Sequence, residues 1–402
     1  MFKEKVIVID AICGKGKTEY AIKYMNENKG NKSFIFVTPY LKEVSRIIEK
    51  CGFISPENDK NKKKIEDFEI LIDSGLNIAT THKLFTHITP RMIDKIKNSN
   101  YELILDEVID VVSETSLKGN DRKALLEIGL LKECNGILER GDEDKIMSFN
   151  DEDWAYKGIV NGLKRKNLQI FENKILIWLF PVDIFECFKK IYILTFMFNG
   201  YPIAPYFKLH GIEYTKMQVE NGELVDYYLD DVSYLKKLID IDENEKINYI
   251  GKSRGSFTVY WYKGLEDNDL LQIRKNMVNF IQNKCNAKMK DVIWTTFSEN
   301  LDKVLNSKAK SNNFISHNLR ATNDYIDKTV CLYMVSRNYN PIIKRWFAEK
   351  HIEVNQDIYA LAEMIQLVFR SAIRKREEIK LYCPSNRMRN LFLKWINGDI
   401  KI

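Results

Sequence analysis

The feature that most constrains the fold is an apolar run that enters a glycine-containing loop and continues directly into a helix-favouring segment. Residues 6–10 are the apolar run, residues 11–18 read AICGKGKT, and residues 19–25 have helical character. Glycines in such a loop let the backbone curl, so that its N–H groups and the N-terminus of the next helix face a bound phosphate. The order predicts a strand, a phosphate-binding loop and a helix, although Ala11 stands in place of the first glycine of the usual pattern.

The residue types in this loop predict a nucleoside triphosphate and Mg²⁺ as ligands. Lys17 is expected to bridge the β- and γ-phosphates. Thr18 is expected to place its hydroxyl on Mg²⁺, because this cation prefers oxygen ligands and keeps several waters and phosphates. Gly14, Lys15 and Gly16 complete the expected phosphate contacts. A chance lysine in a glycine-rich turn is the alternative that the flanking strand and helix disfavour.

An adjacent pair of carboxylates, Asp106 and Glu107, follows the apolar residues 103–105. Acidic residues at strand ends are ordinary, so this pair taken alone is equally consistent with a structural role. Together with the phosphate loop it predicts that Asp106 engages Mg²⁺ and that Glu107 orients and deprotonates an attacking water.

A third signal lies near the C-terminus, where Gln366, Arg370 and Arg374 are spaced to share one face of a helix expected over residues 357–376. Phosphoryl transfer gains from a cation that meets the charge developing on the γ-phosphate, and an arginine delivered from a second domain supplies it. A surface helix with solvated arginines is the alternative. Which of the two arginines would act is left open by the spacing.

The alternation of apolar strands with helical segments predicts an α/β protein with parallel sheets flanked by helices. We expect a first domain over residues 1–205, with a helical elaboration over about 111–185, and a second domain over residues 206–402. The expected strands are 33–37, 76–80, 103–105, 191–194, 256–262, 291–297 and 329–334, and the expected helices include 41–50, 270–284 and 357–376.

Composition adds little beyond excluding some classes. The seven cysteines form no C-x-x-C pair, which argues against a disulfide framework and a zinc site. The formal net charge of +6 is mildly basic and favours a polyanionic partner only slightly. Apolar stretches stop short of a membrane-spanning length, so a soluble, cytoplasmic protein of a bacterial or phage-infected cell is expected.

The order of these motifs resembles superfamily 2 helicases, and more narrowly the compact DEAD-like helicases of bacteriophages and their hosts. The resemblance implies two tandem RecA-like domains, ATP as the nucleotide, and hydrolysis in the cleft between the domains. It runs through nearly the whole chain, with motifs I, Ia, Ic, II, III, IV, V and VI at residues 11–18, 38–40, 79–82, 106–107, 194–197, 293–297, 320–325 and 366–374.

The resemblance also implies that four threonines, Thr38, Thr81, Thr296 and Thr322, contact the backbone of a single strand, because hydroxyls bind phosphates without reading sequence. A strand-end residue or a helix cap is the alternative for each. Asp324 is expected to help link the ATP site to the strand. Single-stranded or forked DNA is the expected partner, and RNA is the alternative.

Two departures keep other functions open. Met197 stands where motif III has a second hydroxyl, which leaves Thr195 to act alone, and Phe369 precedes Arg370 where motif VI has a glycine. A nucleotide-gated switch that binds nucleic acid without unwinding it is one alternative. A DNA-packaging ATPase is another, although the second half offers no clustered carboxylates for a nuclease.

Four aromatic residues could stack on bases but are interpreted as core and edge residues of the expected strand 256–262. They are Phe257, Tyr260, Trp261 and Tyr262.

Overall fold

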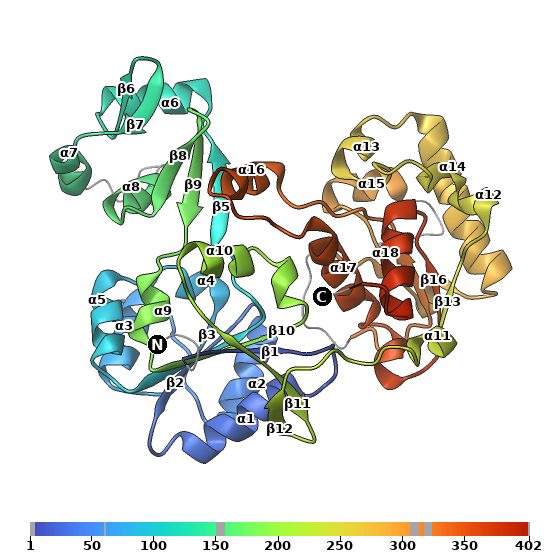
Figure 1. Ribbon diagram of the computed structural model, residues 1–402, viewed down its shortest axis with the longest axis horizontal. Helices are drawn as coiled ribbons and strands as arrows, with labels where there is room; N and C mark the ends of the chain where they lie inside the picture. Colours follow the sequence, from blue (N-terminus) through green and yellow to red (C-terminus); the bar gives the residue numbers. More distant parts are fainter. Residues whose placement is uncertain (1–4, 60–61, 150–156, 306–312, 317–323, 401–402) are drawn as a thin grey trace.

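The computed structural model describes residues 5–59, 62–149, 157–305, 313–316 and 324–400, and its elements form two lobes (Figure 1). One lobe is built on a seven-stranded sheet and the other on a four-stranded sheet. The expectation of an α/β fold with two sheets flanked by helices is confirmed. Two residues of motif V, Arg320 and Thr322, lie outside the described residues.

The first sheet has the strand order β12-β11-β1-β10-β4-β2-β3 and is parallel except at β12. Its central strands β4 and β10 are mostly apolar and buried along nearly their whole length, as expected where helices cover both faces. The strands are β1 (Val6–Asp10), β2 (Ser33–Thr38), β3 (Ile78–Thr81), β4 (Tyr101–Asp106), β10 (Lys190–Thr195), β11 (Thr215–Glu220) and β12 (Glu223–Asp226). The helices are α1 (Lys17–Asn28), α2 (Leu41–Cys51), α3 (Lys64–Asp73), α4 (His82–Phe85), α5 (Pro90–Lys97), α9 (Asp183–Cys187), the 3₁₀ turn η1 (Phe198–Gly200) and α10 (Ile203–Leu209).

Strands β11 and β12 carry the first sheet beyond residue 205, where the sequence analysis placed the domain boundary. They form a hairpin whose two turn residues, Asn221 and Gly222, have φ of 50° and 80°. Positive φ at both positions is what a two-residue hairpin turn needs, and Asn-Gly is the residue pair that favours it. The hairpin was therefore readable from the sequence and was missed.

The elaboration between β4 and β10 is a mixed structure, and it contains strands where a largely helical segment was expected. A three-stranded antiparallel sheet, β5-β9-β8, and a hairpin, β6-β7, accompany its helices. The β6-β7 turn is again an Asn-Gly pair, Asn135 and Gly136, both with positive φ. The elements are β5 (Val112–Ser116), α6 (Gly119–Glu127), β6 (Leu131–Cys134), β7 (Ile137–Arg140), α7 (Glu143–Ser148), α8 (Lys157–Lys164), β8 (Leu168–Phe171) and β9 (Ile175–Leu179).

The second sheet is parallel with the order β13-β16-β15-β14. Its strands are β13 (Ile239–Ile241), β14 (Val292–Thr295), β15 (Val330–Tyr333) and β16 (Ile379–Tyr382). Its α-helices are α11 (Leu235–Leu238), α12 (Glu245–Asn248), α13 (Val259–Lys263), α14 (Asp267–Val278), α15 (Leu301–Val304), α16 (Pro341–Glu349), α17 (Gln356–Val368) and α18 (Asn386–Asn397). Shorter turns are η2 (Tyr249–Gly251), the π-helix η3 (Asn279–Lys284), η4 (Met289–Asp291), η5 (Ser298–Asn300) and η7 (Ala372–Lys375).

Two expected elements of this lobe are wrong. The strand expected at 256–262 is helix α13, because the Thr258 hydroxyl accepts the N–H of Trp261 as an N-cap and Phe257 takes a φ of 63°. The long helix expected at 357–376 ends at Val368. Beyond it the N–H of Ala372 bonds to the carbonyl of Lys328, which draws the chain off the helix axis.

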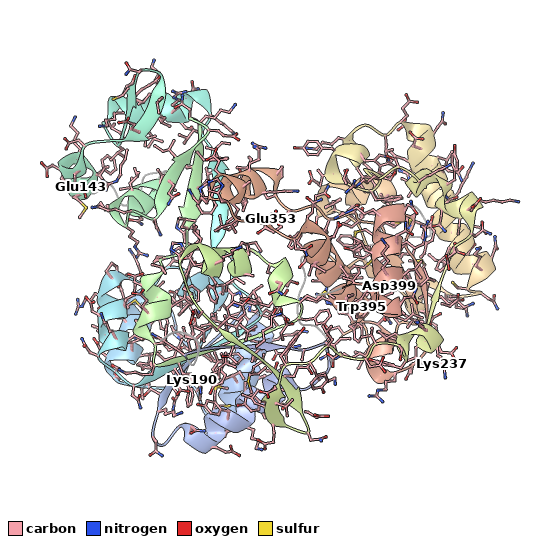
Figure 2. The ribbon with its side chains drawn as sticks, in the orientation of Figure 1. Glu143, Lys190, Lys237, Glu353, Trp395 and Asp399 are labelled. Carbon is pink, nitrogen blue, oxygen red and sulfur yellow. The ribbon has the colours of Figure 1, made fainter. Side chains whose placement is uncertain are left out.

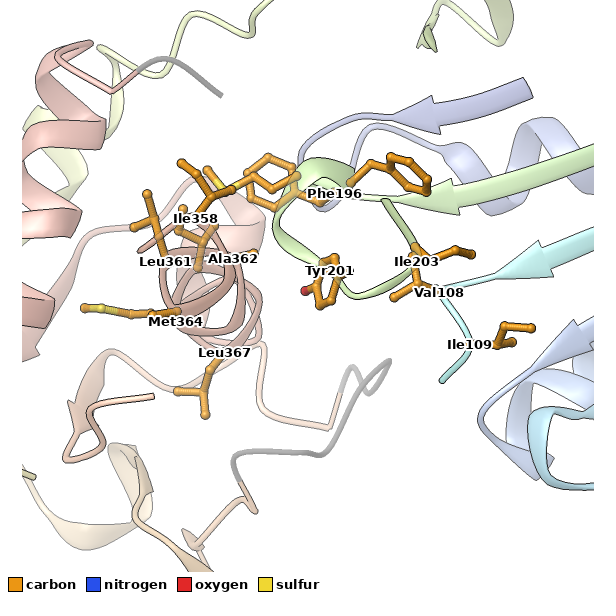
Figure 3. Close-up of a cluster of buried hydrophobic side chains, with 14 of the residues drawn as sticks. Val108, Ile109, Phe196, Tyr201, Ile203, Ile358, Leu361, Ala362, Met364 and Leu367 are labelled. Carbon is orange, nitrogen blue, oxygen red and sulfur yellow. The ribbon is translucent and has the colours of Figure 1, made fainter. Parts of the chain in front are cut away.

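The two lobes meet where α17 packs against the turn η1 and the start of α10 (Figure 3). Tyr201 faces Ile358, Ala362 and their neighbours on α17 in this buried cluster, while Ile203 lies behind it near Val108. The ring of Trp395 on α18, labelled in Figure 2, lies 6.4 Å from that of Phe196 at the end of β10. The junction is apolar and close-packed, so it fixes how the helix presents the residues that follow it.

Gly200 makes the closest approach at this junction, and replacing it tests the packing. A Cβ on Gly200 would lie 2.9 Å from the Tyr359 nitrogen and 3.0 Å from the Ile358 carbonyl carbon. We expect Gly200→Ala to lower the free energy of unfolding by about 1–3 kcal/mol, as overpacking does. Gly255→Ala is the control, since no atom lies within 4 Å of its added Cβ. Equal urea midpoints for the two variants would contradict this prediction.

Candidate nucleotide site between the two sheets

The phosphate-loop residues form a curled turn between β1 and α1. Gly14 and Gly16 have φ of 89° and 82°, a conformation that only glycine adopts at no cost. Helix α1 begins directly at Lys17, so its free N–H groups point into the curl. The Lys17 ammonium donates to the carbonyls of Ala11 and Ile12 within the same turn. The loop is thus pre-shaped around the lysine that was expected to meet phosphate.

Asp106, at the end of β4, is the carboxylate that faces this loop. The Thr18 hydroxyl donates to Asp106 Oδ1 over 3.3 Å, and the Thr38 hydroxyl donates to Oδ2 over 3.4 Å. Burial, together with the nearby charges of Glu107 and Glu43, raises the pKa of Asp106 to about 7. Because burial and the neighbouring acids disfavour the ionised form of Asp106, a cation bound beside it would stabilise that form.

The donors at Asp106 fit Mg²⁺. Thr18 and Asp106 bring a hydroxyl and a carboxylate together, which are oxygen ligands of the kind that this cation takes. Among the described residues no three His, Cys, Asp or Glu side chains gather into a metal site. A cation here would therefore draw its other ligands from water and phosphate.

Glu107 sits on a strained turn directly after Asp106. Its φ is 71°, and its N–H donates to the Leu194 carbonyl over 2.9 Å. Its carboxylate atom Oε2 is buried and makes no hydrogen bond within the described part of the chain. Left-handed backbone at a non-glycine residue is tolerated mainly where the surroundings enforce it, and such positions cluster at functional sites.

Asp10 is a site residue that the sequence analysis missed. It is 3% exposed at the end of β1, and its carboxylate accepts the N–H of Met197 over 2.6 Å and that of Phe198 over 3.1 Å. Lys216 on β11 donates to the same carboxylate over 3.0 Å. Asp10 thereby ties the turn after β10 to the start of the phosphate loop. An acid ending an apolar strand was its sequence signal, the same signal that marked Asp106.

A second missed carboxylate, Asp230, contacts the outer side of the phosphate loop. It accepts the N–H of Ile12 over 3.2 Å and pairs with Lys15 at 3.1 Å. Desolvation, the largest single influence, lowers the pKa of Lys15, but the hydrogen bond to Asp230 and the electrostatic contributions of Asp230, Tyr228 and Glu220 together raise it by more, so the net shift is upward. Lys15 is therefore engaged by the chain itself in this structure.

Gln366 and the two arginines do not share one helix face, because α17 ends at Val368. Gln366 lies on α17 and donates to the Tyr201 hydroxyl over 2.8 Å. Arg370 follows the end of the helix, is 5% exposed, and its Nη1 has no hydrogen-bond partner among the described residues. Burial lowers the pKa of Arg370. Arg374 is exposed on η7.

The charges of both arginines nevertheless act on the phosphate loop. Burial raises the pKa of the Cys13 thiol in that loop, and the charges that act on it are, in order, those of Lys17, Glu107, Arg374 and Arg370. Residues about 350 positions apart in the chain thus lie within electrostatic reach of one another. The structure brings the three sequence signals together at one place.

The threonines expected to bind a strand have mixed outcomes. Thr38 and Thr296 are 0% exposed in this arrangement, and their contact with a nucleic-acid backbone stays a prediction. Thr81 caps helix α4 by accepting the N–H of Leu84 over 3.4 Å. Thr322 lies outside the described residues. Asp324 is exposed and pairs with Lys42 of α2 at 3.1 Å, across the two lobes.

Comparison with known proteins identifies the family. The chain is 36% identical over 419 residues to the SPbeta prophage-derived uncharacterized protein YonV of Bacillus subtilis (strain 168), covering 98% of this chain and 100% of that protein. The chain belongs to the YonV family. The model of the YonV C-terminal Rossmann-like domain matches residues 233–396. This match spans the whole second sheet and carries Gln366, Arg370 and Arg374.

Solved structures with some likeness are also found. The helicase MrfA bound to DNA and AMPPNP is 10% identical with a TM-score of 0.37, over 98% of this chain and 48% of that one. Xpd4 of S. tokodaii is 12% identical with a TM-score of 0.46, over 97% of this chain and 94% of that one. The chain spans about half the length of MrfA. Likenesses at this level do not bear on function. Within the part of the chain that is described, none of the helices has the length and apolar character to cross a bilayer.

The pKa of Asp106 gives a test of the site without ligand. Since its pKa is about 7 in the folded protein, against 3.8 for an ordinary aspartate, the folded state binds the proton more tightly, and stability from this group falls as pH rises through this window. Asp106→Asn should therefore raise the melting temperature most at about pH 8, roughly half as much at about pH 5.5, and little at about pH 3.5, where the carboxyl is protonated in both the folded and the unfolded state. Asp110→Asn, at an exposed carboxylate nearby, serves as the control. A pH-independent difference at Asp106 would refute the assignment.

Proposed function

We propose that this chain is an ATP-hydrolysing nucleic-acid motor of the superfamily 2 helicase type, working in the cleft between its two sheets. One observation carries the proposal. Arg370 of the second lobe is buried within electrostatic reach of Cys13 in the phosphate loop, and its Nη1 has no hydrogen-bond partner among the described residues. A buried cation without a partner implies an anionic ligand, and a triphosphate on the loop supplies one.

The roles of the residues follow from their positions. Lys17 would exchange its bonds to the loop carbonyls for phosphate oxygens, and Thr18 and Asp106 would hold Mg²⁺. The cation would neutralise charge on the phosphates. Glu107, with a buried and unbonded carboxylate oxygen, is placed to orient and deprotonate water. Arg370 would stabilise the charge that develops on the transferred phosphoryl group.

Coupling between nucleotide and lobe position would run through Tyr201. Its hydroxyl donates to Glu363 over 3.3 Å and accepts from Gln366, both on α17, while its backbone follows the turn held by Asp10. Movement at the phosphate loop would thus be passed to the helix that carries Arg370 into place. Lobe closure around a ligand is a common use of such a junction.

The proposal includes a nucleic-acid strand as the partner of the motor. The four expected threonines and Asp324 stay as proposed contacts to the strand or to its coupling with the ATP site. We place the boundary between the two domains in residues 227–238, between the last strand of the first sheet and the first strand of the second. The start of the family-model match at residue 233 supports this position.

A nucleotide-gated switch that does not unwind is the second candidate. The burial of Thr38 and Thr296 favours it, because two of the expected strand contacts are buried in this arrangement. ATPase turnover measured with and without single-stranded DNA and RNA, beside a strand-displacement assay, separates the two. Hydrolysis stimulated by nucleic acid without displacement indicates a switch or a translocase.

The phosphate-loop assignment is tested with Lys17→Ala and Glu107→Gln. Lys17→Ala should abolish hydrolysis by weakening triphosphate binding, while Glu107→Gln should retain nucleotide and lose turnover, because only water activation is removed. Phosphate release and nucleotide affinity are the two measurements. Lys29→Ala, at the end of the same helix α1, is the matched control. Wild-type turnover in either site variant would defeat the assignment.

The choice between the two arginines is tested by substitution of each. Arg370→Ala should lower kcat by roughly 10³- to 10⁵-fold with little change in KM, since a finger arginine acts on the transition state. Arg374→Ala should have a smaller effect, because Arg374 is exposed. Arg274→Ala, on α14, is the control for loss of a guanidinium, since its side chain donates to the Lys303 carbonyl within the second lobe. A larger kcat loss for Arg374→Ala than for Arg370→Ala would reverse the assignment.

A further inference from the structure

A second hollow lies in the second lobe and uses none of the nucleotide-site residues. It has a volume of about 1010 Å³ and is formed by residues of α12, η2, α13 and α14. Helices α12 and α14 lie on the side of the lobe remote from the first sheet (Figure 1). Neither the phosphate loop nor any motif residue contributes to it, so the nucleotide site does not explain it.

Large aromatic rings are exposed to solvent at this hollow. Tyr249 and Tyr260 are 73% and 79% exposed, and the partly buried Trp261 lies beside them in the lining. The aromatic residues expected to be core thus divide, with Phe257 and Tyr262 fully buried and Tyr260 and Trp261 at the surface. Exposed rings gathered at one hollow are uncommon on a soluble surface and mark a binding site.

The buried members of this group hold the exposed ones in place. The Tyr262 hydroxyl donates to the Met334 carbonyl over 3.0 Å, and the ring of Phe257 lies 4.5 Å from that of Trp261. The Thr258 cap fixes the start of α13. Because α13 is anchored in this way, Tyr260 is presented outward without a rearrangement of the fold.

Cations line the same hollow and extend it. Lys246 and Lys252 belong to its wall, and an adjoining hollow of about 320 Å³ shares Lys252 and adds Arg254 and Lys394. All four are exposed, and within the described residues none forms an ion pair with a carboxylate. Asp269 is the acidic residue of the wall, and Arg387 in the adjoining hollow is already paired with Asp357. The balance at the joined hollows is positive.

We propose that these two hollows form an accessory binding groove for single-stranded nucleic acid. Bases would stack on Tyr260, Tyr249 and Trp261, and the backbone phosphates would meet Lys252, Arg254 and Lys394. Rings that stack beside unpaired cations are the combination that binds single strands without reading sequence. A peptide partner would satisfy the rings but leave the positive charge unmatched. The accessory groove depends on the proposed function in one respect only, the choice of nucleic acid as the class of ligand.

The test is equilibrium binding of fluorescent oligothymidylate and oligouridylate of about ten nucleotides to the full-length protein. It is done without nucleotide and in a Lys17→Ala background. We expect Tyr260→Ala to weaken binding roughly 5- to 100-fold, Tyr260→Phe to retain it, and a blunt duplex to show no dependence on residue 260. Lys252→Ala should lower the slope of log affinity against log salt by about 0.7, while Lys275→Ala on α14, outside the hollow, should not.

The outcomes separate this groove from the ATPase. Unchanged oligonucleotide affinity in both Tyr260→Ala and Lys252→Ala overturns the groove, whatever the ATPase activity. Loss of affinity in these variants supports it even if the wild-type protein hydrolyses no ATP, in which case the proposed function fails alone. Equal loss in Tyr260→Phe and Tyr260→Ala would also overturn the stacking role. Since Tyr260 and Lys252 are exposed, melting temperatures equal to wild type serve as the folding check.

Discussion

The burial of the Arg370 guanidinium between the two lobes is the constraint on which the rest of the structure depends. Removing the charge of Arg370 from water is costly, and burial already lowers its pKa. The carboxylate charges of Glu363 on α17 and of Glu107 on the facing lobe offset part of this cost. The apolar junction of α17 with η1 offsets more, because it buries large side chains on both sides (Figure 3). The charge that is still unmatched is the physical reason to expect an anion between the lobes.

The end of strand β10 is where the parts of this site are joined. The Thr195 carbonyl accepts the N–H of Ala11 over 3.1 Å, and the Leu194 carbonyl accepts the N–H of Glu107 over 2.9 Å. Two residues further on, the Met197 N–H donates to Asp10. The phosphate loop, Glu107 and the turn that meets α17 are therefore all bonded to backbone groups within residues 194–197. Met197, which replaces an expected hydroxyl, contributes through its backbone, so the absence of that hydroxyl does not break this connection.

The features that could be predicted from the sequence are those formed by residues that are adjacent along the chain. The phosphate loop and the Asp106-Glu107 pair are contiguous patterns, and the hydrogen bond from Thr18 to Asp106 joins them in the fold. Asp230 and Tyr201 were missed because their partners lie hundreds of positions away or on another lobe. The helix over 357–376 failed because the bond from Ala372 to Lys328 is tertiary and overrides local propensity. The two Asn-Gly hairpins and the Thr258 cap were local signals, and a closer count of turn residues would have found them.

The cationic side chains of this mildly basic chain fall into two groups, those in ion pairs with carboxylates and those of the accessory groove. Many form ion pairs with nearby carboxylates. Arg345 pairs with Glu172 and joins α16 to the elaboration, and Lys95 pairs with Glu69 between α5 and α3. Those of the accessory groove form no ion pair with a carboxylate within the described residues, and Lys252 lies over the exposed ring of Tyr249, 5.9 Å from its centroid. Exposed ion pairs contribute little to stability, so the chain could have paired these cations too without much consequence for folding. Their isolation next to Tyr260 is therefore better explained by a ligand than by the needs of the fold.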